Sequence, residues 1–301
     1  MKITGKGGIS ATIIQDSVSE DGIRITTFEL EYPRFIHAEF MTHRQFSRNA
    51  ASSRAIPIEK MHKHISENMA MPIHWGINEA GMQANTQLVG RELGDAINNW
   101  QVACDMAIHN SRMLMLSRLH KQIANRVTEP FQMMKTVVTA TEWNNWYWLR
   151  NHVDAQPEIH ELAKIMYELQ QQSIPLELGE NEWHLPYIRR DKTANSIMYF
   201  TDNEAIGLQD AKQVSASCCA QVSYRRLDDS LEKAKMIFDR LINSEPVHAS
   251  PIEHQATPII STDSGQWPVG VTHKDRENNL WSGNFKHWIQ NRQLFNNHVK
   301  H

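Results

Sequence analysis

The chain has 301 residues, of which 41% are hydrophobic and 22% charged, and its formal net charge is −3. This composition is ordinary for a globular protein with a sizeable core, and the slightly acidic balance argues against nucleic acid as a partner. Sixteen histidines are present, but the sequence contains no HExxH and no CxxC motif, so we expect no metal site.

The cysteines and the hydropathy pattern bear on location. The three cysteines do not form a disulfide framework, because Cys218 and Cys219 are adjacent and leave Cys104 alone. A reducing cytoplasm is the simplest interpretation. No apolar run approaches the roughly 18 residues of a membrane span, and the N-terminal MKITGKGGIS lacks the apolar core of a signal peptide. We therefore expect a cytoplasmic protein without a membrane partner.

The first elements expected are strands. ATIIQ and IRITTFELEY alternate and are rich in β-branched and aromatic residues, with the turn SEDG between them, and RFIHAEFM at 34–41 is predicted as a further strand. Residues 58–90 are rich in Met and Asn and yield no assignment.

Helices are expected later in the chain. The pattern is helical over 90–127, with a break near Leu119 and an end at Pro130. Residues 134–150 carry apolar and aromatic residues, and an amphipathic helix follows with Pro157 at its start. The remaining expectations are a loop at 184–196, a helix at 201–224 with Thr201 as N-cap, a helix at 230–243 capped by Ser230 or a neighbouring aspartate, and short strands and turns after 255.

No linker, repeat or low-complexity segment divides the chain. We therefore predict one catalytic domain over residues 1–301, of the α/β or α+β class, with long helices and a mostly antiparallel sheet.

The segment MTHRQFSRNAASSRAIP at 41–57 is the first candidate site. It places a histidine and three arginines among hydroxyls and amides. An arginine fork matches phosphate oxygens two at a time, and nearby hydroxyls can complete an anion cradle. The histidine could contact a phosphate, stack on a ring or move a proton. A solvated loop with surface arginines is the alternative, and the chemistry alone leaves both open.

The same segment resembles the signature of the flavin-dependent thymidylate synthases, which is Arg-His-Arg, two residues, Ser, and then a Ser-x-Arg close. The residues on the family's spacing are His43, Arg44, Ser47, Asn49, Ser52 and Arg54. Two positions depart from it: Thr42 stands where the family has its first Arg, and Ala50 where it usually has Glu.

A second resemblance covers ANRVTEP and TEWNNWYWLRNHVDAQPEIHELA. Arg126 lies four residues before Pro130, like the family's phosphate-contacting arginine, and Arg150 falls on the arginine that resembles its substrate activator. TEWNNW replaces the family's usual Asn-x-Arg, which makes Asn145 the best match for a flavin-facing amide. The alternative for Arg150 is a structural ion pair.

A third resemblance lies at 215–258, where CAQVSY and ASPIEHQATP are similar to elements that precede the arginine motif in the family. The chain is therefore identified as a circularly permuted, divergent member, with a helical core at 90–173. Permutation is tolerated when the original termini lie close together and the new ones open a surface loop. A satisfied capping pair is the alternative for Glu253 and His254.

The resemblance implies a methyltransferase that converts dUMP to dTMP. Methylenetetrahydrofolate would give the carbon, and FAD reduced by NADPH the hydride. The implied roles are FAD binding by His43, Arg44, Asn145, Ser223, Ser250 and Glu253, dUMP binding by Ser52, Ser53, Arg54 and Arg126, and catalysis on the uracil ring by Arg150. The resemblance also implies a homotetramer whose sites are shared between subunits.

Several alternatives stay open. Cys218 or Cys219 could be a nucleophile beside the VSY element. Alternation of Trp288, Gln290 and Arg292 predicts a strand with one polar face, and Arg292 could replace the arginine missing at Thr42. The rival functions are a related flavin enzyme that methylates or hydroxymethylates another pyrimidine nucleotide, and a non-catalytic nucleotide-binding homologue.

Overall fold

The computed structural model describes residues 1–193, 197–201, 204–223, 228–260 and 266–299. Its central sheet has the strand order β1-β2-β3-β5-β4, all antiparallel, and β6 pairs with β2 in parallel. These strands are Lys2–Thr4 (β1), Ser10–Ser19 (β2), Arg24–Pro33 (β3), Ser47–Ala50 (β4), Met133–Ala140 (β5) and Leu176–Leu178 (β6). The predicted class, long helices with a mostly antiparallel sheet, is confirmed.

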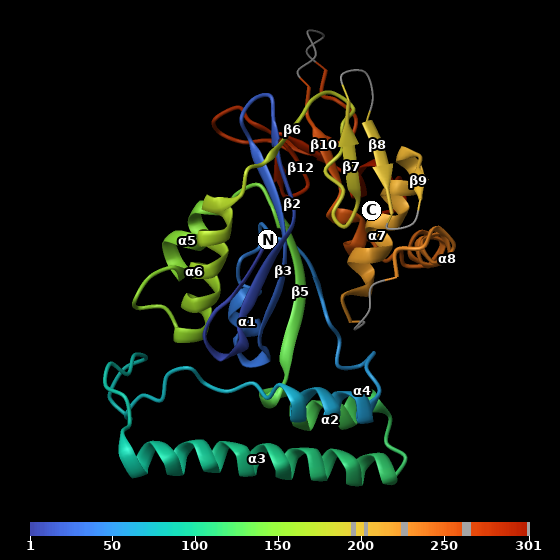
Figure 1. The fold of residues 1–301 in the computed structure, drawn as a ribbon. Coiled ribbons are helices and arrows are strands. Elements are labelled where there is room, and N and C mark those ends of the chain that lie inside the picture. Colours follow the sequence, from blue (N-terminus) through green and yellow to red (C-terminus); the bar gives the residue numbers. More distant parts are fainter. Residues whose placement is uncertain (194–196, 202–203, 224–227, 261–265, 300–301) are drawn as a thin grey trace.

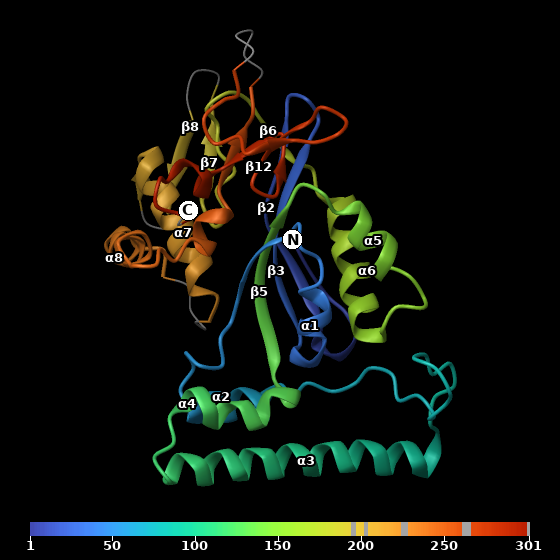
Figure 2. The same ribbon diagram turned by 180° about the vertical axis from the view of Figure 1, so that it is seen from behind.

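Helices and small strands cover both faces of this sheet (Figures 1 and 2). One face carries α5 (Asn144–Arg150) and α6 (Pro157–Gln172), and the C-terminal part of the chain lies against the other, with α7 (Leu208–Ala220) and α8 (Leu231–Ile242). The strands of that part are Arg189–Lys192 (β7), Ile197–Phe200 (β8), Ala205–Ile206 (β9), Ala256–Pro258 (β10), His273–Lys274 (β11), Leu280–Ser282 (β12), Phe285–Lys286 (β13) and Trp288–Gln290 (β14).

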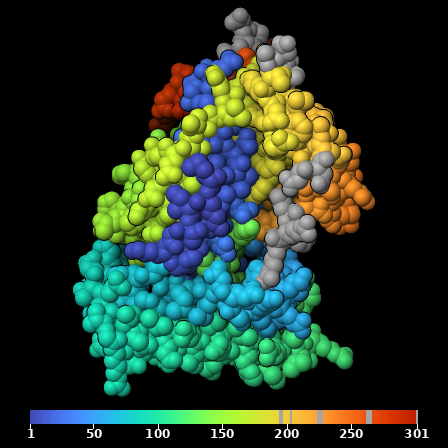
Figure 3. All heavy atoms as spheres, in the orientation of Figure 1, coloured from blue at the N-terminus to red at the C-terminus, as the bar shows by residue number. Residues whose placement is uncertain are grey.

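A helical layer closes one end of the sheet, and Figure 3 shows it along the bottom of the molecule. Its helices are Ile58–Glu67 (α2), Gly90–Leu116 (α3), Lys121–Ala124 (α4) and the 3₁₀ helix Asn125–Phe131 (η3). The ring of Trp100 on α3 meets Phe131 at 5.3 Å between centroids. Within the described ranges, no helix combines the length and apolar character that crossing a bilayer demands.

The alternation of β3 divides the core from a polar interface. Phe28 and Leu30 are fully buried and belong to the same cluster as Leu162 and Met166 of α6. Successive strand residues point to opposite faces, so Thr27 is directed toward the C-terminal part of the chain. One strand therefore supplies both the apolar core and a buried polar layer.

The polar layer is a chain of hydrogen bonds that runs from Ser17 to His254. The ring of His184 joins Ser17 at 2.9 Å and Thr27 at 2.8 Å. Thr27 then meets Thr139 at 2.7 Å, and Thr139 meets Nδ1 of His254 at 2.8 Å. Burial lowers the pKa of His254 to about 3 and that of His184 well below its ordinary value. Both rings are therefore neutral at pH 7 and fasten the C-terminal part to the sheet.

The predicted hairpin, the helix break and the helix start are confirmed. β2 and β3 pair across the turn at 20–23. Helix α3 ends at Leu116, shortly before Arg118 with a φ of 62°. Helix α6 has Pro157 in its first turn, and the side chain of the preceding Gln156 caps it.

The predicted strand at 34–41 is wrong. Strand β3 ends at Pro33, which has no N–H with which to continue the ladder. The chain turns instead into a 3₁₀ helix, Arg34–Ile36 (η2), and the short helix His37–Phe40 (α1). Ile36 and Phe40 are buried, four residues apart, which is the spacing of one helical face.

Three predictions in the C-terminal part are also corrected. The helix expected at 201–224 begins only at Leu208 with Gly207 as N-cap, because Ala205 and Ile206 form β9 and pair with β8. Residues 202, 203 and 224 of this prediction lie outside the described residues. The loop expected at 184–196 contains β7. The strand expected through Arg292 ends at Gln290 with all three of its residues buried, so it has no polar outer face. Arg292 lies in the following 3₁₀ helix, Asn291–Leu294 (η6).

We expect acid to destabilise the protein through His254. Its pKa in the folded state, about 3, lies below the unfolded value of 6.5. The unfolded chain therefore binds more protons as the pH falls below 6.5, and the free energy of unfolding falls with it. This histidine should cost about 2 kcal/mol at pH 5 relative to pH 7.5.

Urea unfolding at the two pH values measures this loss. His254→Gln should lower stability at pH 7.5 and reduce the loss on acidification by that amount, whereas the exposed-site control His109→Gln should not. An equal loss in the wild type and in His254→Gln would contradict the neutral, buried state of this ring.

Candidate functional site

His43 lies in the turn between α1 and β4, and aromatic side chains hold it there. Its ring stacks on Phe46 at 5.8 Å and meets the edge of Trp146 at 4.7 Å between centroids. Only 9% of His43 is exposed. The sequence builds this packing by flanking the histidine with Phe40 and Phe46, both buried in the main core.

Arg150, the last residue of α5, is bonded to this histidine. Its Nε donates to Nε2 of His43 at 3.1 Å, and its Nη1 donates to the carboxylate of Glu39 in a close ion pair. Nη2 has no hydrogen bond among the residues that the structure describes. Because Nε2 of His43 accepts, we assign its proton to Nδ1. The sequence motif pointed to His43 and Arg150 but gave no signal for Glu39.

The histidine is held in its neutral form. Burial, followed by the charges of Arg150 and Arg48, lowers the pKa of His43 to about 4. At pH 7 the ring can therefore donate through Nδ1 but carries no charge. The positive charge at this place belongs to Arg150, which Glu39 partly balances.

Strand β4 connects the histidine to residues 250–253 of the C-terminal part. Arg48 donates to the carbonyl of His43 at 2.6 Å. In the orientation that satisfies both of its polar atoms, the Asn49 amide donates to the carbonyls of Arg48 and Ser250, at 3.0 and 3.2 Å. Burial lowers the pKa of Arg48, and the charge of Glu253 opposes that shift. The structure thus brings Ser250 and Glu253 beside the arginine motif, roughly 200 residues away in sequence.

Glu253 also has a partner of its own. Its carboxylate forms a close ion pair with Arg292, and Nη1 of Arg292 donates a hydrogen bond to it. The backbone carbonyl of Glu253 accepts from Gln290 at 3.1 Å. The sequence suggested only that Arg292 replaces the arginine that the family has at the position of Thr42. In the structure Arg292 contacts Glu253, which is a predicted FAD-binding residue.

Two of the predicted nucleotide residues, Ser53 and Arg126, contact Glu129. The hydroxyl of Ser53 donates to this carboxylate at 3.0 Å, and Arg34 pairs with it at 2.9 Å. Arg126 is farther away, at 3.6 Å, and its side chain is 54% exposed. Ser52 accepts from the backbone N–H of Arg54 at 3.3 Å. Arg126 is therefore weakly tied and can turn toward another anion, and neither Glu129 nor Arg34 was predicted.

Other predicted site residues do not join these groups. Arg44, Arg54 and Asn145 are exposed, and their side chains make no hydrogen bond or ion pair within the described part of the chain. Asn145 precedes Arg150 by five residues, which is about 140° around a helix, so it lies on a different face of α5. Ser223 ends the 3₁₀ helix Gln221–Ser223 (η4), and its side chain lies outside the described residues.

The cysteines are poorly suited to nucleophilic attack. Cys218 and Cys219 are buried, at 1% and 0% exposure. Burial raises the pKa of Cys219 well above its ordinary value, so the reactive thiolate is disfavoured. Among the described residues, no group of three His, Cys, Asp or Glu side chains is placed to hold a metal ion.

Comparison with known proteins adds the following. A family model described as thymidylate synthase complementing protein matches residues 24–176, just over half of the chain. A crystal structure of a UMP/dUMP methylase PolB from Streptomyces cacaoi bound with 5-Br dUMP is similar at 17% identity and a TM-score of 0.46, with 58% of this chain and 93% of that chain covered. The same methylase bound with 5-Br UMP is similar at 15% identity and a TM-score of 0.46, with 56% and 90% covered. No curated protein matches the sequence.

We expect Arg150→Met to raise the pKa of His43 above about 4, because the charge of Arg150 is one of the causes of its depression. Burial is the larger cause and persists, so the pKa should stay below 6.5. NMR titration of the His43 ring, assigned with a His43→Gln variant, measures the change. Arg126→Met serves as the matched control and should leave the titration unchanged. An unaltered pKa in Arg150→Met would show that the two side chains are not bonded in solution.

Proposed function

Because the chain belongs to the family of thymidylate synthase complementing proteins, we propose that it is a flavin-dependent thymidylate synthase. The reaction joins the methylene carbon of 5,10-methylenetetrahydrofolate to C5 of dUMP, which loses its proton, and adds a hydride that NADPH supplies through FAD. The products are dTMP, tetrahydrofolate and NADP⁺. The observation that carries the proposal is Arg150, fixed by His43 and Glu39 with Nη2 left to donate.

Arg150 would act on the uracil ring. Carbon C5 becomes nucleophilic when negative charge develops on the ring, and a preorganised cation stabilises that charge without reorganisation. The two bonds that hold Arg150 restrict its rotation, and its side chain is 22% exposed, so solvent screening is limited. A neutral His43 leaves the positive charge on the arginine. The raised pKa of Cys219 agrees with a mechanism that does not need a cysteine nucleophile.

The dUMP phosphate and sugar would bind at the second half of the arginine motif. Arg54 has an exposed guanidinium without a partner in the described chain, and the Ser52 hydroxyl lies beside its backbone. Arg126 is the second cation, and it would turn from Glu129 toward the phosphate. Ser53 would hold the loop in place through Glu129.

FAD would bind at the first half of the motif and at the displaced element. The free guanidinium of Arg44 and the Nδ1–H of His43 are donors of the kind that a diphosphate or a flavin carbonyl needs, so the residues present fit this cofactor. Ser250, Glu253, Asn145 and Ser223 would complete the site. When bound, FAD passes the hydride from NADPH to the transferred carbon.

We also propose a permuted single domain that assembles as a homotetramer. The position of Ser250 and Glu253 beside β4 supports the permutation, because these residues meet the arginine motif although they are roughly 200 positions away in sequence. The exposure of Arg44, Arg54 and Asn145 supports sites that are completed by another subunit.

A second candidate is a related enzyme that methylates or hydroxymethylates a different pyrimidine nucleotide. The departures at Thr42 and Ala50 favour it, because Thr42 donates its hydroxyl to the carbonyl of Glu39 and offers no charge to a ligand. Incubation with dUMP or dCMP and labelled methylenetetrahydrofolate distinguishes the two enzymes by product mass. A purified protein that stays colourless after FAD is added, and forms no product, would instead indicate a non-catalytic homologue.

We expect Arg150→Met to lower the turnover number for dTMP formation by about 100-fold or more, because it removes a donor to the developing charge. The loss should fall on kcat more than on KM for dUMP. Product formation is measured by mass spectrometry, and growth of a thymidine-requiring host gives an independent test. Arg240→Met, an exposed change on α8, is the control. Normal activity of Arg150→Met would contradict the proposed role of Arg150 in stabilising charge on the uracil ring.

A further inference from the structure

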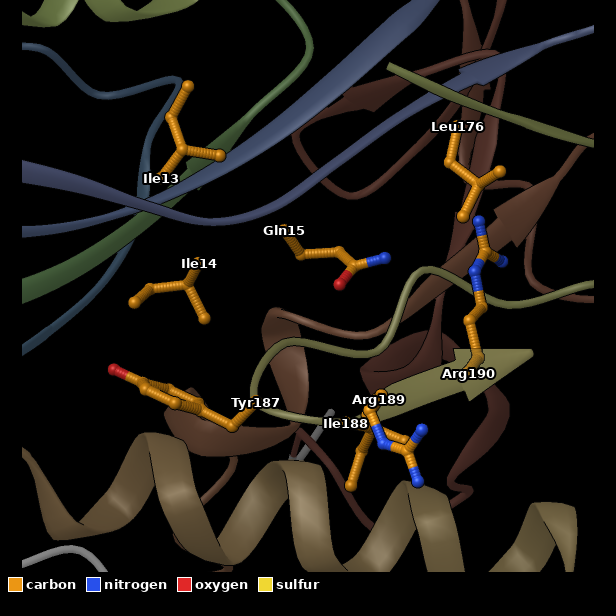
Figure 4. A pocket seen from close by; sticks show the side chains of 8 residues that line it. All are labelled: Ile13, Ile14, Gln15, Leu176, Tyr187, Ile188, Arg189 and Arg190. Carbon is orange, nitrogen blue, oxygen red and sulfur yellow. The ribbon is translucent and has the colours of Figure 1, made fainter. Parts of the chain in front are cut away.

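A cleft of about 470 Å³ lies between strand β2 and the segment 187–190, and its lining includes none of the predicted nucleotide or FAD residues. Figure 4 shows Ile13, Ile14 and Gln15 on one side of it and Tyr187 to Arg190 on the other. Strand β1 pairs with β2 only as far as Thr12, and β6 only from Ser17. Between these two points, no described strand covers this edge of β2.

The backbone on both sides of the cleft is irregular. The register of β2 shifts between Ile13 and Gln15, which displaces Ile14 from the ladder as in a β-bulge. Tyr187 has a φ of 68°, in the left-handed region that costs a bulky residue about 1 kcal/mol or more. Its hydroxyl donates to Glu29 at 2.9 Å, which fixes the ring. The hydrogen bond to Glu29 therefore fixes the Tyr187 ring at the wall of the cleft, on a backbone with a left-handed conformation.

Arg190 brings a positive charge to the cleft, and only part of its guanidinium has a hydrogen-bond partner. Its Nη1 donates to the carbonyl of Trp183 at a long 3.4 Å. Its Nε and Nη2 are buried and have no hydrogen-bond partner in the part of the chain that is described. Buried donors without hydrogen-bond partners are costly, and burial lowers the pKa of Arg190, a shift that the charges of Tyr199 and Glu182 oppose. Such orphaned donors call for a partner that the chain itself does not supply.

The remaining lining suits a flat organic anion. Gln15 makes no hydrogen bond to a described residue, and in Figure 4 its amide extends toward the side of the cleft where the Arg190 guanidinium lies beside Leu176. Ile14 and Ile188 line the cleft together with Tyr187, whereas Ile13 also packs against the main core, and none of the described residues that line the cleft is acidic. In the same figure, the Arg189 guanidinium is directed away from Gln15, and it stacks over Phe200 at 4.3 Å.

We propose that this cleft binds a ligand with a flat ring and an anionic group, placing the carboxylate or phosphate on Arg190 and Gln15 and the ring against Tyr187. An arginine and an amide can together satisfy one such anion with charge-assisted bonds. The volume falls in the range of about 300–1,000 Å³ that is typical of small-molecule sites. A small turn of the guanidinium would present Nε and Nη2 to the anion.

The choice of probes rests on the proposed function, whose reactants share this chemistry. Tetrahydrofolate carries its anion as glutamate carboxylates, whereas dUMP and NADPH carry phosphates. Calorimetric titration of each into the full-length protein measures binding without turnover, and inorganic phosphate and glutamate serve as bare anions. If the wild-type protein binds a probe but forms no dTMP, the proposed function is refuted and the proposal of a ligand site in the cleft is unaffected.

Arg190→Met tests the site most sharply, because it keeps the length of the side chain and removes the charge. We expect it to fold, because the one hydrogen bond that it loses within the described part of the chain is the long one from Nη1 to Trp183. One of the three probes should bind about tenfold more weakly or worse. Gln15→Leu should weaken the same probe by a smaller factor, and Arg240→Met should leave it unchanged.

The identity of the affected probe tells a carboxylate ligand from a phosphate ligand, and either result supports the proposal. The proposal is overturned if all three probes bind Arg190→Met as they bind the wild type, or if none binds the wild type. If Arg190→Met does not fold, Gln15→Leu decides in its place, and unchanged affinity for every probe then overturns the proposal.

Discussion

The hydrogen bond from Arg150 to His43 joins the parts of the molecule on which the candidate site depends. It links the end of α5 to the turn before β4, and Glu39 adds α1 to the same cluster. Burial keeps His43 neutral, so that its Nε2 accepts the hydrogen bond from Arg150 and the guanidinium keeps the positive charge. An arginine held in this way has a fixed direction and a free Nη2, which is what stabilisation of charge on a bound ring requires.

The sheet connects this cluster to the C-terminal part of the chain. Its α6 face is apolar, whereas its other face carries neutral His184 and His254 in one hydrogen-bonded chain with Thr27 and Thr139. That chain docks the C-terminal part of the protein so that Ser250 meets Asn49 of β4. A segment roughly 200 positions away in sequence therefore contacts the arginine motif without a covalent connection nearby.

The sequence was informative wherever the pattern was local. The β2–β3 hairpin, the start of α6 at Pro157 and the cationic segment after Met41 follow from periodicity, proline and composition. It failed where a distant partner decides the outcome. Glu39 and Arg150 are 111 positions apart, and nothing in RFIHAEFM indicates that its glutamate pairs with a later arginine. The Ser53–Glu129 contact and the orphaned donors of Arg190 are likewise products of tertiary packing, which a single sequence does not encode in any local pattern.

The central claim is that Arg150 stabilises negative charge on a bound uracil ring. The ¹⁵N NMR signal of dUMP labelled at N3, observed in complex with the FAD-loaded protein, tests it directly. The account predicts a shift toward the value of the deprotonated ring in the wild-type complex, and its loss in a dUMP complex of Arg150→Met. A signal that stays at the neutral position in the wild type, or that is the same in both complexes, would contradict the account.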